Sequence, residues 1–287
     1  MKVGFIGAGK VALAMGNYWL SKGVAILGYS SRNMDSAQKH AVLTNTRAFT
    51  SPAALAEEAT LIMITTSDDA ILSVAETLAG FSLPWEQKIV CHMSGAHSSQ
   101  LLSSLSDKGA TICSFHPMIS FGTVPMSGFN LDKAFFTFEG TGQRLKDIES
   151  FLHFLGHRYE LIDPDQKVLY HTAACVLSNY FVTLLNTGMQ MLKRSGISQE
   201  NMMDCLKPLI EKTWENVLKT GPESAMTGPI SRGDARTIQL HLESLLKEGR
   251  SDWLEIYKTM GKATVELAVQ AGRIDPETAD NLYKELQ

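Results

Sequence analysis

The chain has 287 residues, of which 44% are hydrophobic, and its 26 basic and 30 acidic residues give a formal net charge of −4. This length and composition predict a globular protein of one or two domains with a large core. The charge balance provides no basic face for nucleic acid, so we expect no nucleic-acid partner, and any small anionic substrate must be held by local groups.

The four cysteines, Cys91, Cys113, Cys175 and Cys205, form no C-x-x-C pair, and each lies in an apolar run. This pattern is typical of buried free thiols in a reducing compartment and does not indicate a metal site. The apolar start of the chain is too short for a signal peptide, and no apolar segment approaches the ~20 residues that span a bilayer. We therefore expect a cytoplasmic protein without a metal ion or a membrane contact.

The first half of the chain alternates short apolar runs with helical patterns, and the helical patterns carry start signals such as Ser51–Pro52 and Ser67 followed by two acids. This alternation predicts an α/β fold with a parallel, doubly wound Rossmann sheet. The expected strands lie at residues 2–6, 24–29, 60–66, 88–93, 110–115 and 134–138.

The pattern becomes purely helical after residue 163, so we predict a nucleotide-binding domain over residues 1–163 and an all-helical domain over residues 164–287. Pro208 should kink or split the second of the later helices. Residues 220–234 form the longest irregular break of this half. The expected helices lie at residues 165–195, 199–219, 234–247, 252–271 and 275–286.

A glycine-rich turn follows the first strand, with the spacing Gly7-x-Gly9-x-x-Ala12. The first glycine permits a tight turn, the second lets the backbone approach a pyrophosphate, and the small third residue lets the helix pack on the strand. The start of the following helix offers unpaired N–H groups to phosphate. This turn within a βαβ unit predicts a dinucleotide site over an ordinary strand–turn–helix, with the residues Gly7, Ala8, Gly9, Lys10 and Val11 at the cofactor.

The end of the second strand selects between the two nicotinamide dinucleotides. An NAD site usually has an acidic residue there, but none occurs between Gly28 and Met34. The sequence instead carries Ser30, Ser31 and Arg32, and two hydroxyls with a guanidinium suit a 2′-phosphate. We therefore expect NADP(H), although the same segment can be a polar turn in which Asn33 caps the next helix.

Polar residues also follow the later strands at the edge where ligands of open α/β sheets bind. Thr65, Thr66 and Ser67 can line the nicotinamide side, or they can cap the next helix. Ser94 and Gly95 follow the strand at residues 88–93, and we expect them to contact substrate, unless they form a plain turn. His116 points to the same edge, where it is either a substrate contact or a structural histidine.

The stretch KVLYHTAACVLSN, residues 167–179, interrupts an apolar helix with polar residues. At about 100° per residue, Lys167, His171 and Ser178 fall on one stripe and Asn179 flanks it. Reduction of a ketone requires a proton donor to the developing alkoxide, which predicts Lys167, His171 and Asn179 as catalytic residues. The alternative is that His171 lies at a domain interface and the Lys167 side chain extends into solvent.

In the irregular segment GPISRGD, Arg232 can bind a substrate carboxylate in bidentate fashion, and Asp234 can cap the next helix. The chain carries five motifs, GAGKVA, HMSGA, FHPMISF, KVLYHTAACVLSN and GPISRGD. Through them it resembles the superfamily of 6-phosphogluconate dehydrogenase-like reductases. It is most similar to a Rossmann-like bacterial family whose helical C-terminal domain was long of unknown function.

This resemblance implies an NADP-dependent oxidoreductase and, as some members are alternative ketopantoate reductases, reduction of 2-dehydropantoate (ketopantoate) to pantoate in pantothenate biosynthesis. It also implies a homodimer through the helical domain. Better-known ketopantoate reductases carry an Asn four residues after the Lys, where this chain has His171. Activities like those of pyrroline-5-carboxylate reductase or prephenate dehydrogenase remain alternatives, as does a non-catalytic NADP(H)-binding sensor.

Overall fold

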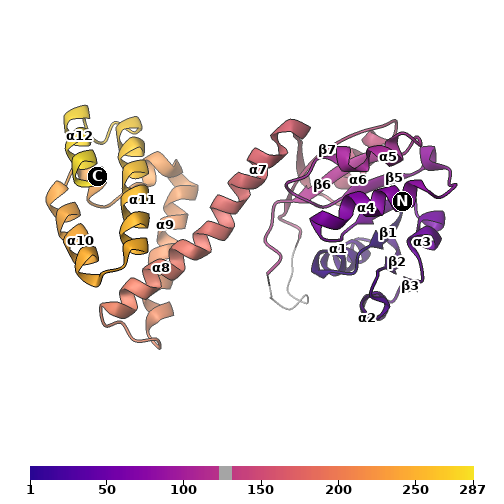
Figure 1. The fold of residues 1–287 in the computed structure, drawn as a ribbon, viewed down its shortest axis with the longest axis horizontal. Helices are drawn as coiled ribbons and strands as arrows, with labels where there is room; N and C mark the ends of the chain where they lie inside the picture. The colour runs from indigo at the N-terminus through magenta and orange to yellow at the C-terminus, as the bar shows by residue number, and fades with distance from the viewer. Residues whose placement is uncertain (123–130) are drawn as a thin grey trace. The chain divides into compact units, whose positions relative to one another are not determined.

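The computed structural model describes residues 1–122 and 131–287, which form two compact units, Met1–Phe181 and Val182–Gln287 (Figure 1). The described part of the first unit contains one sheet with the strand order β3-β2-β1-β4-β5-β6-β7-β8. Only the β6–β7 pair is antiparallel among the described strands, so the predicted parallel, doubly wound sheet is confirmed. The strands are β1 (Lys2–Ile6), β2 (Ala25–Ser30), β3 (Arg47–Phe49), β4 (Leu61–Ile64), β5 (Ile89–His92), β6 (Thr111–Pro117), β7 (Phe135–Thr141) and β8 (Arg158–Leu161).

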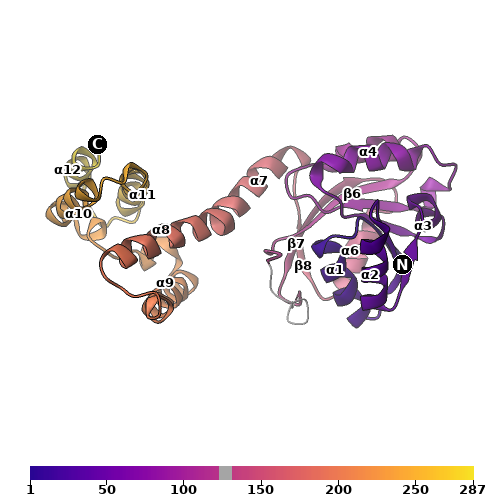
Figure 2. The same cartoon turned by 60° about the horizontal axis from the view of Figure 1, so that its bottom comes forward.

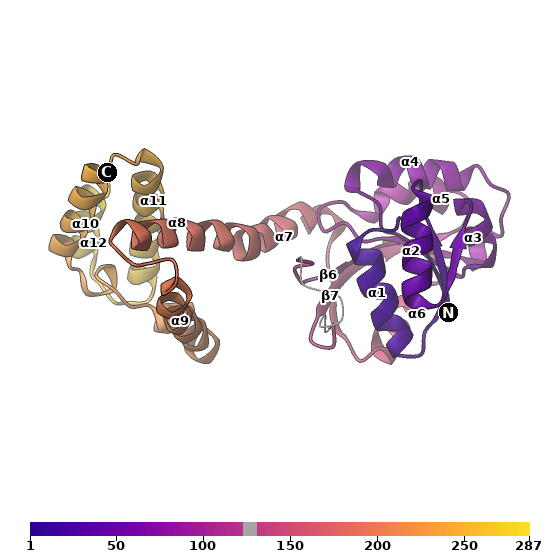
Figure 3. The same cartoon turned by 90° about the horizontal axis from the view of Figure 1, so that it is seen from below.

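Helices cover both faces of this sheet. The buried residues of α1 (Lys10–Ser21), α2 (Met34–Thr44) and α6 (Leu145–Phe154) form one core cluster with the strands, and α1 and α2 lie side by side in Figure 3. Those of α3 (Pro52–Glu58), α4 (Asp68–Ala79) and α5 (Ser103–Ser106) form a second cluster on the other face. The central strands are therefore apolar on both sides.

Strand β4 shows why a continuous apolar run forms such a strand. Leu61 and Met63 belong to the first core cluster, whereas Ile62 and Ile64 belong to the second. Successive side chains of a strand point to opposite faces, so each run of this kind contributes side chains to the cores on both faces of the sheet.

The helix starts lie at the predicted signals, and two of the three N-cap side chains make capping bonds. Pro52 begins α3, and the hydroxyl of Ser51 accepts the N–H of Ala54. Asn33 caps α2 by accepting the N–H groups of Asp35 and Ser36, which confirms the capping interpretation for this residue. Ser67 occupies the N-cap position of α4 without a side-chain capping bond.

The helix predicted at residues 165–195 is continuous but not uniform. Helix α7 (Lys167–Ala174) passes into a π-helical turn (Cys175–Tyr180) and then into α8 (Phe181–Arg194). By length and composition alone, the helix Pro164–Arg194 could cross a membrane, so the expectation that no segment reaches this length is wrong. One such helix is weak evidence for a membrane, and Lys167 and His171 interrupt its apolar sequence.

The second unit is helical, as predicted, and α10, α11 and α12 pack together around a core cluster (Figure 2). Pro208 does not split α9, because helical dihedrals continue through it and the break lies at Gly221, with φ 77° and ψ 163°. The break predicted at residues 220–234 thus begins at Gly221, and beyond it only residues 222–225 and the 3-10 turn Ile230–Arg232 are helical before α10. The bounds are α9 (Met202–Ala225), α10 (Ala235–Glu248), α11 (Ser251–Gln270) and α12 (Pro276–Glu285).

Two sequence expectations need correction. Strands β3 and β8 were not predicted, because both are short and carry charged residues. All four cysteines are free, but only Cys91 and Cys113 are buried, while Cys175 is half-buried and Cys205 is exposed. An apolar run around a cysteine thus predicted the burial of its thiol correctly only for Cys91 and Cys113, where the run forms a central strand.

Candidate functional site in the sheet unit

The carboxyl ends of β1, β4, β5 and β6 lie at one edge of the sheet because these strands run parallel. The glycine turn after β1 is at this edge. Gly7 has φ 106°, and a Cβ there would lie 2.6 Å from the backbone of Thr65. Gly9 is the N-cap of α1 and has no side chain to cap the helix, so the cap residue leaves the first N–H groups of this helix free for another acceptor. This backbone is a cradle that fits a pyrophosphate.

The residues after β4 complete the turn. The Thr65 hydroxyl lies 2.8 Å from the Gly7 carbonyl oxygen, to which it donates, and the Thr65 N–H donates to Ile6. Thr66 has a buried hydroxyl without a partner among the described residues. Thr65 therefore fixes the glycine turn, and Thr66 has an unused hydrogen-bonding group beside it.

The end of β2 carries the residues predicted to hold a 2′-phosphate. Ser30 is buried, with 2% of its surface exposed, whereas Ser31 is half-buried and Arg32 is exposed. The hydroxyl of Ser31 accepts the N–H of Asn33. The guanidinium of Arg32 is thus the most accessible of these groups for a phosphate.

Ser94 lies at the end of β5 and is buried. Its hydroxyl donates to the Asp68 carboxylate, with an Oγ–Oδ2 distance of 2.8 Å, and accepts the N–H groups of Ala96 and His97. The hydroxyl is therefore engaged within the protein, where it ties the turn after β5 to the start of α4.

Lys167 and Ser114 form the central contact of the site. The side chain of Lys167 has no exposed surface, and its Nζ donates to the Ser114 Oγ at 2.5 Å. The Ser114 hydroxyl in turn donates to the backbone oxygen of Ser94, at 3.3 Å. The alternative that the Lys167 side chain extends into solvent is wrong, because the ammonium is buried at the carboxyl edge of the sheet.

Two carboxylates stabilise the charge of this ammonium. Glu139 on β7 is opposite Ser114 in the β6–β7 register, is 2% exposed, and accepts from the N–H and the hydroxyl of Ser99. Burial lowers the pKa of Lys167 below its usual value, and the negative charges of Glu139 and Asp68 partly oppose this shift. Lys167 is thereby a better proton donor than an exposed lysine.

Two imidazoles meet over Gly95. A Cβ at this glycine would lie 2.5 Å from the Nδ1 of His171 and 2.9 Å from the Nε2 of His116. The Nδ1 of His171 is buried without a partner among the described residues. The Nδ1 of His116 is 2.8 Å from the hydroxyl of Tyr170. The structure thus brings Gly95, His116 and His171 together beside Lys167, all within the first unit.

His92 and His116 are neutral near pH 7. Burial lowers the pKa of each to about 4, and the positive charge of Lys167 contributes to both shifts. Neither imidazole carries a proton that it can release at neutral pH, so each acts as a neutral group with one hydrogen-bond donor and one acceptor.

The other predicted site residues lie outside this group. Asn179 is exposed and lies in the π-helical turn, where the 100° period no longer applies, so it does not continue the stripe. Arg232 is exposed in the second unit, and the structure does not place it relative to Lys167. Asp234 caps α10 by accepting the N–H of Thr237, which confirms its capping role.

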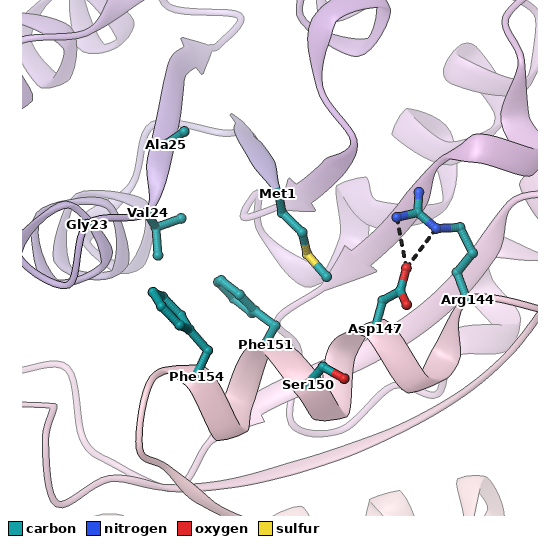
Figure 4. A pocket seen from close by; sticks show the side chains of 9 residues that line it. All are labelled: Met1, Gly23, Val24, Ala25, Arg144, Asp147, Ser150, Phe151 and Phe154. Atoms are coloured by element: carbon teal, nitrogen blue, oxygen red, sulfur yellow. Dashed lines mark hydrogen bonds and ion pairs between the residues drawn. The ribbon is translucent and has the colours of Figure 1, made fainter.

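A pocket of about 550 Å³ lies elsewhere on the first unit (Figure 4). Met1 and Val24 line it at the starts of β1 and β2, with Phe151 and Phe154 of α6. These are the amino ends of the strands, whereas the glycine turn lies at their carboxyl ends. This pocket therefore does not mark the site.

Sequence reasoning missed Asp68, Ser114, Glu139 and Tyr170. Ser114 and His116 are two residues apart on β6 and share a face, so their spacing in an apolar strand was an available signal. Glu139 is a carboxylate inside the apolar strand β7. The contact between Tyr170 and His116 joins distant segments, and no local pattern reveals it.

Comparison with known proteins agrees with this architecture. Residues 1–117 match the family model of a Rossmann-like domain, and residues 134–264 match the model described as a domain of unknown function (DUF2520). No curated protein matches the chain in sequence.

Solved structures share the fold over nearly the whole chain. A candidate NADP oxidoreductase from Bacteroides fragilis has 21% identity and a TM-score of 0.74, over 92% of this chain and 98% of its own. A reductive aminase from Aspergillus terreus, solved with NADPH4, cyclohexanone and allyl amine, has 17% identity and a TM-score of 0.68, over 100% of this chain and 99% of its own. A pyrroline-5-carboxylate reductase from Coxiella burnetii has 15% identity and a TM-score of 0.59, over 99% of this chain and 98% of its own.

The first-unit sheet, its glycine turn and the two family matches lead to one assignment. The chain joins a Rossmann-like domain to a C-terminal domain of the DUF2520 family.

Proposed function

We propose that the protein is an NADPH-dependent reductase of a small 2-oxo acid, with ketopantoate as the substrate and pantoate as the product. The observation that carries this proposal is the buried ammonium of Lys167, which Ser114 holds at the sheet edge shared with the glycine turn. A ketone reductase needs a proton donor at this edge, and burial of a lysine without such a use is costly.

The residues present fit the cofactor. The turn at Gly7–Val11 would hold the pyrophosphate, Arg32 with Ser30 and Ser31 the 2′-phosphate, and Thr65–Ser67 the nicotinamide side. When bound, NADPH supplies the hydride. The structural relatives solved with NADPH support the cofactor assignment.

In the proposed reaction Lys167 is the acid. The carbonyl carbon would receive the hydride, and Lys167 would give the proton from its Nζ to the carbonyl oxygen, which leaves a neutral amine that must take up a proton before the next turnover. Ser114 holds the amine during this step through its hydroxyl. Because His116 is neutral near pH 7, it donates a hydrogen bond and is not the proton source.

The positive charge of Lys167 favours a C=O substrate over a C=N substrate. A protonated imine is a cation that already carries its proton, so a buried ammonium would repel it and have no proton to supply. A 2-oxo acid is an anion whose ketone needs the proton. The choice of ketopantoate among 2-oxo acids rests on the family resemblance.

The remaining predicted roles stay proposals. Arg232 would bind the substrate carboxylate and Asn179 would orient the carbonyl, and both side chains are exposed and available for contact. Ser94 would act through the turn that it stabilises. His171, whose Nδ1 has no partner within the described part of the chain, is the alternative proton donor of the same helix.

We also propose that the active form is a homodimer. Several large apolar side chains of the helix that begins at Lys167 are exposed, and such surfaces mark interaction sites. On α9, Trp214 is 60% exposed. A second copy of the chain would cover these residues, so the purified cytoplasmic protein should sediment as a dimer. The exposed large apolar side chains of the long helix are Val168, Leu169, Val176, Leu177, Tyr180, Phe181, Val182 and Leu184.

The proposal is tested by NADPH absorbance with a panel of 2-oxo acids, cyclic imines and, in the reverse direction, prephenate with NADP⁺. Turnover of ketopantoate above all other compounds supports the assignment. Preference for a cyclic imine would replace it by an activity like that of pyrroline-5-carboxylate reductase. Tight NADPH binding without any turnover would indicate a sensor.

A further inference from the structure

We propose that Tyr170 is a positioning residue that sets the tautomer of His116, so that the Nε2 of His116, which lies beside Gly95, carries the hydrogen and can donate it. This inference rests on the proposed function for its kinetic consequence, but the tautomer itself is a property of the free protein.

The contact between the two residues is well defined. The Nδ1 of His116 lies 2.8 Å from the Tyr170 hydroxyl, and the two rings meet edge to face at 88°, with centroids 5.6 Å apart. Tyr170 comes from α7, one turn before Ala174, whereas His116 is the last residue but one of β6. The hydrogen bond thus joins the helix that carries Lys167 to the strand that carries Ser114.

A neutral imidazole has one N–H donor and one acceptor nitrogen. His116 is neutral near pH 7, because burial and the charge of Lys167 lower its pKa to about 4. The Tyr170 hydroxyl can donate to Nδ1, or it can accept from Nδ1 and turn its own hydrogen to the Met118 sulfur at 3.8 Å. A bond from a phenol to an imidazole nitrogen is stronger than one to a thioether, so the first arrangement is favoured.

With Nδ1 occupied as an acceptor, the hydrogen resides on Nε2. This nitrogen would be 2.9 Å from a Cβ built at Gly95, and the Nδ1 of His171, which has no partner among the described residues, would be 2.5 Å from the same Cβ. The absence of a side chain at Gly95 therefore lets both imidazoles approach its backbone closely. A carbonyl or carboxylate oxygen of a substrate bound beside Gly95 would accept the Nε2–H of His116.

The test is ¹⁵N NMR of the histidine-labelled full-length protein near neutral pH, with His116→Gln to assign the signals of His116. The wild type should show the Nε2–H form, and Tyr170→Phe should shift His116 toward a mixture of tautomers. Tyr180→Phe is the matched control, because Tyr180 is exposed on the same long helix and should leave the signals unchanged.

A kinetic comparison gives the second readout. His116→Gln keeps a donor near the position of Nε2 and should retain most of kcat/KM, whereas His116→Asn should not. Tyr170→Phe should lower kcat/KM about tenfold, the effect of one lost oriented hydrogen bond. If the wild type shows the Nδ1–H form, or Tyr170→Phe changes neither tautomer nor kcat/KM, the inference is overturned. A protein without any reductase activity would refute the proposed function, while the NMR result alone would still decide the tautomer.

Discussion

The ammonium of Lys167 is buried and donates to the Ser114 hydroxyl at 2.5 Å, although the two residues are 53 positions apart in the sequence. This contact fixes the first turn of α7 on the carboxyl end of β6. It also places a charged proton donor next to the turn after β5, through the bond from Ser114 to the Ser94 carbonyl. The proposed chemistry depends on this one relationship.

Replacement of Lys167 by Met should lower kcat/KM at least about a hundredfold, because the proton donor is lost while the buried volume is nearly kept. NADPH affinity should be unchanged, as Lys167 is not part of the glycine turn. The measurement is steady-state kinetics together with NADPH fluorescence titration. Lys193→Met, on the exposed side of α8, is the matched control. Full activity of Lys167→Met would remove Lys167 from the mechanism and leave His171 as the donor.

Ser114→Ala should shift the alkaline limb of the pH profile. The ammonium of Lys167 would lose the hydroxyl that accepts from it, so its already lowered pKa should fall further. An acid is active only while protonated, and the limb should therefore move to lower pH. The profile of kcat against pH measures this shift. An unchanged limb would show that Lys167 does not limit the reaction at high pH.

Gly95→Ala should disrupt the substrate site, because the new Cβ would lie 2.5 Å from the Nδ1 of His171 and 2.9 Å from the Nε2 of His116. We expect a higher KM for the 2-oxo acid and a lower kcat, with NADPH binding retained. Gly80→Ala is the control, since Gly80 has helical dihedrals and is exposed at the end of α4. Wild-type kinetics for Gly95→Ala would contradict the placement of substrate over this glycine.

The free energy of unfolding should fall in mild acid. The pKa values of His92 and His116 are about 4 in the folded protein, whereas unfolded histidines titrate near 6.5, so the unfolded state binds more protons between these values. The stabilisation from the two neutral imidazoles is fully present above about pH 6.5 and is lost as the pH falls toward 4, by about 2 kcal/mol per histidine at pH 5. Urea unfolding above pH 6.5 and at pH 5 measures this loss.

His116→Gln supplies the control for this pH effect. Gln does not titrate, so the variant should lose about half of the difference in unfolding free energy between the two pH values. A wild-type protein equally stable at both would contradict the burial of neutral imidazoles.

Arg32→Ala should raise the KM for NADPH about tenfold or more and leave the KM for NADH nearly unchanged, because the guanidinium would contact only the 2′-phosphate. Arg236→Ala, an exposed arginine of the second unit, is the control. Equal effects on both cofactors would assign Arg32 to another contact. Equal wild-type affinity for the two cofactors would remove the 2′-phosphate site.

The sequence predicts the central sheet well because β1, β4, β5 and β6 are apolar on both faces, and such runs have few alternative structures. The short strands β3 and β8 are stabilised by pairing with a neighbour, which no local pattern records. Local sequence patterns are also incomplete for the residues of the site. The helical period brings Lys167 and His171 to one stripe, but it does not apply at Ser178 and Asn179, where the π-helical turn changes the spacing.

Residues that act through tertiary contacts were the hardest to predict. Lys167 was expected to face either solvent or substrate, and the choice depends on Ser114 and Glu139, which lie on other elements. Arg47 and Glu58 also pair through space, yet they lie on the surface. A charged side chain in a sequence therefore does not reveal whether its partner is water or a buried group.

The most direct test of the account is the initial rate of NADPH oxidation with saturating ketopantoate, measured for the wild type and Lys167→Met with equimolar enzyme. The account predicts rapid turnover by the wild type that exceeds the rate with any cyclic imine, and a loss of at least about a hundredfold in the variant. Equal rates for the two proteins, or a wild type that reduces only cyclic imines, would contradict it.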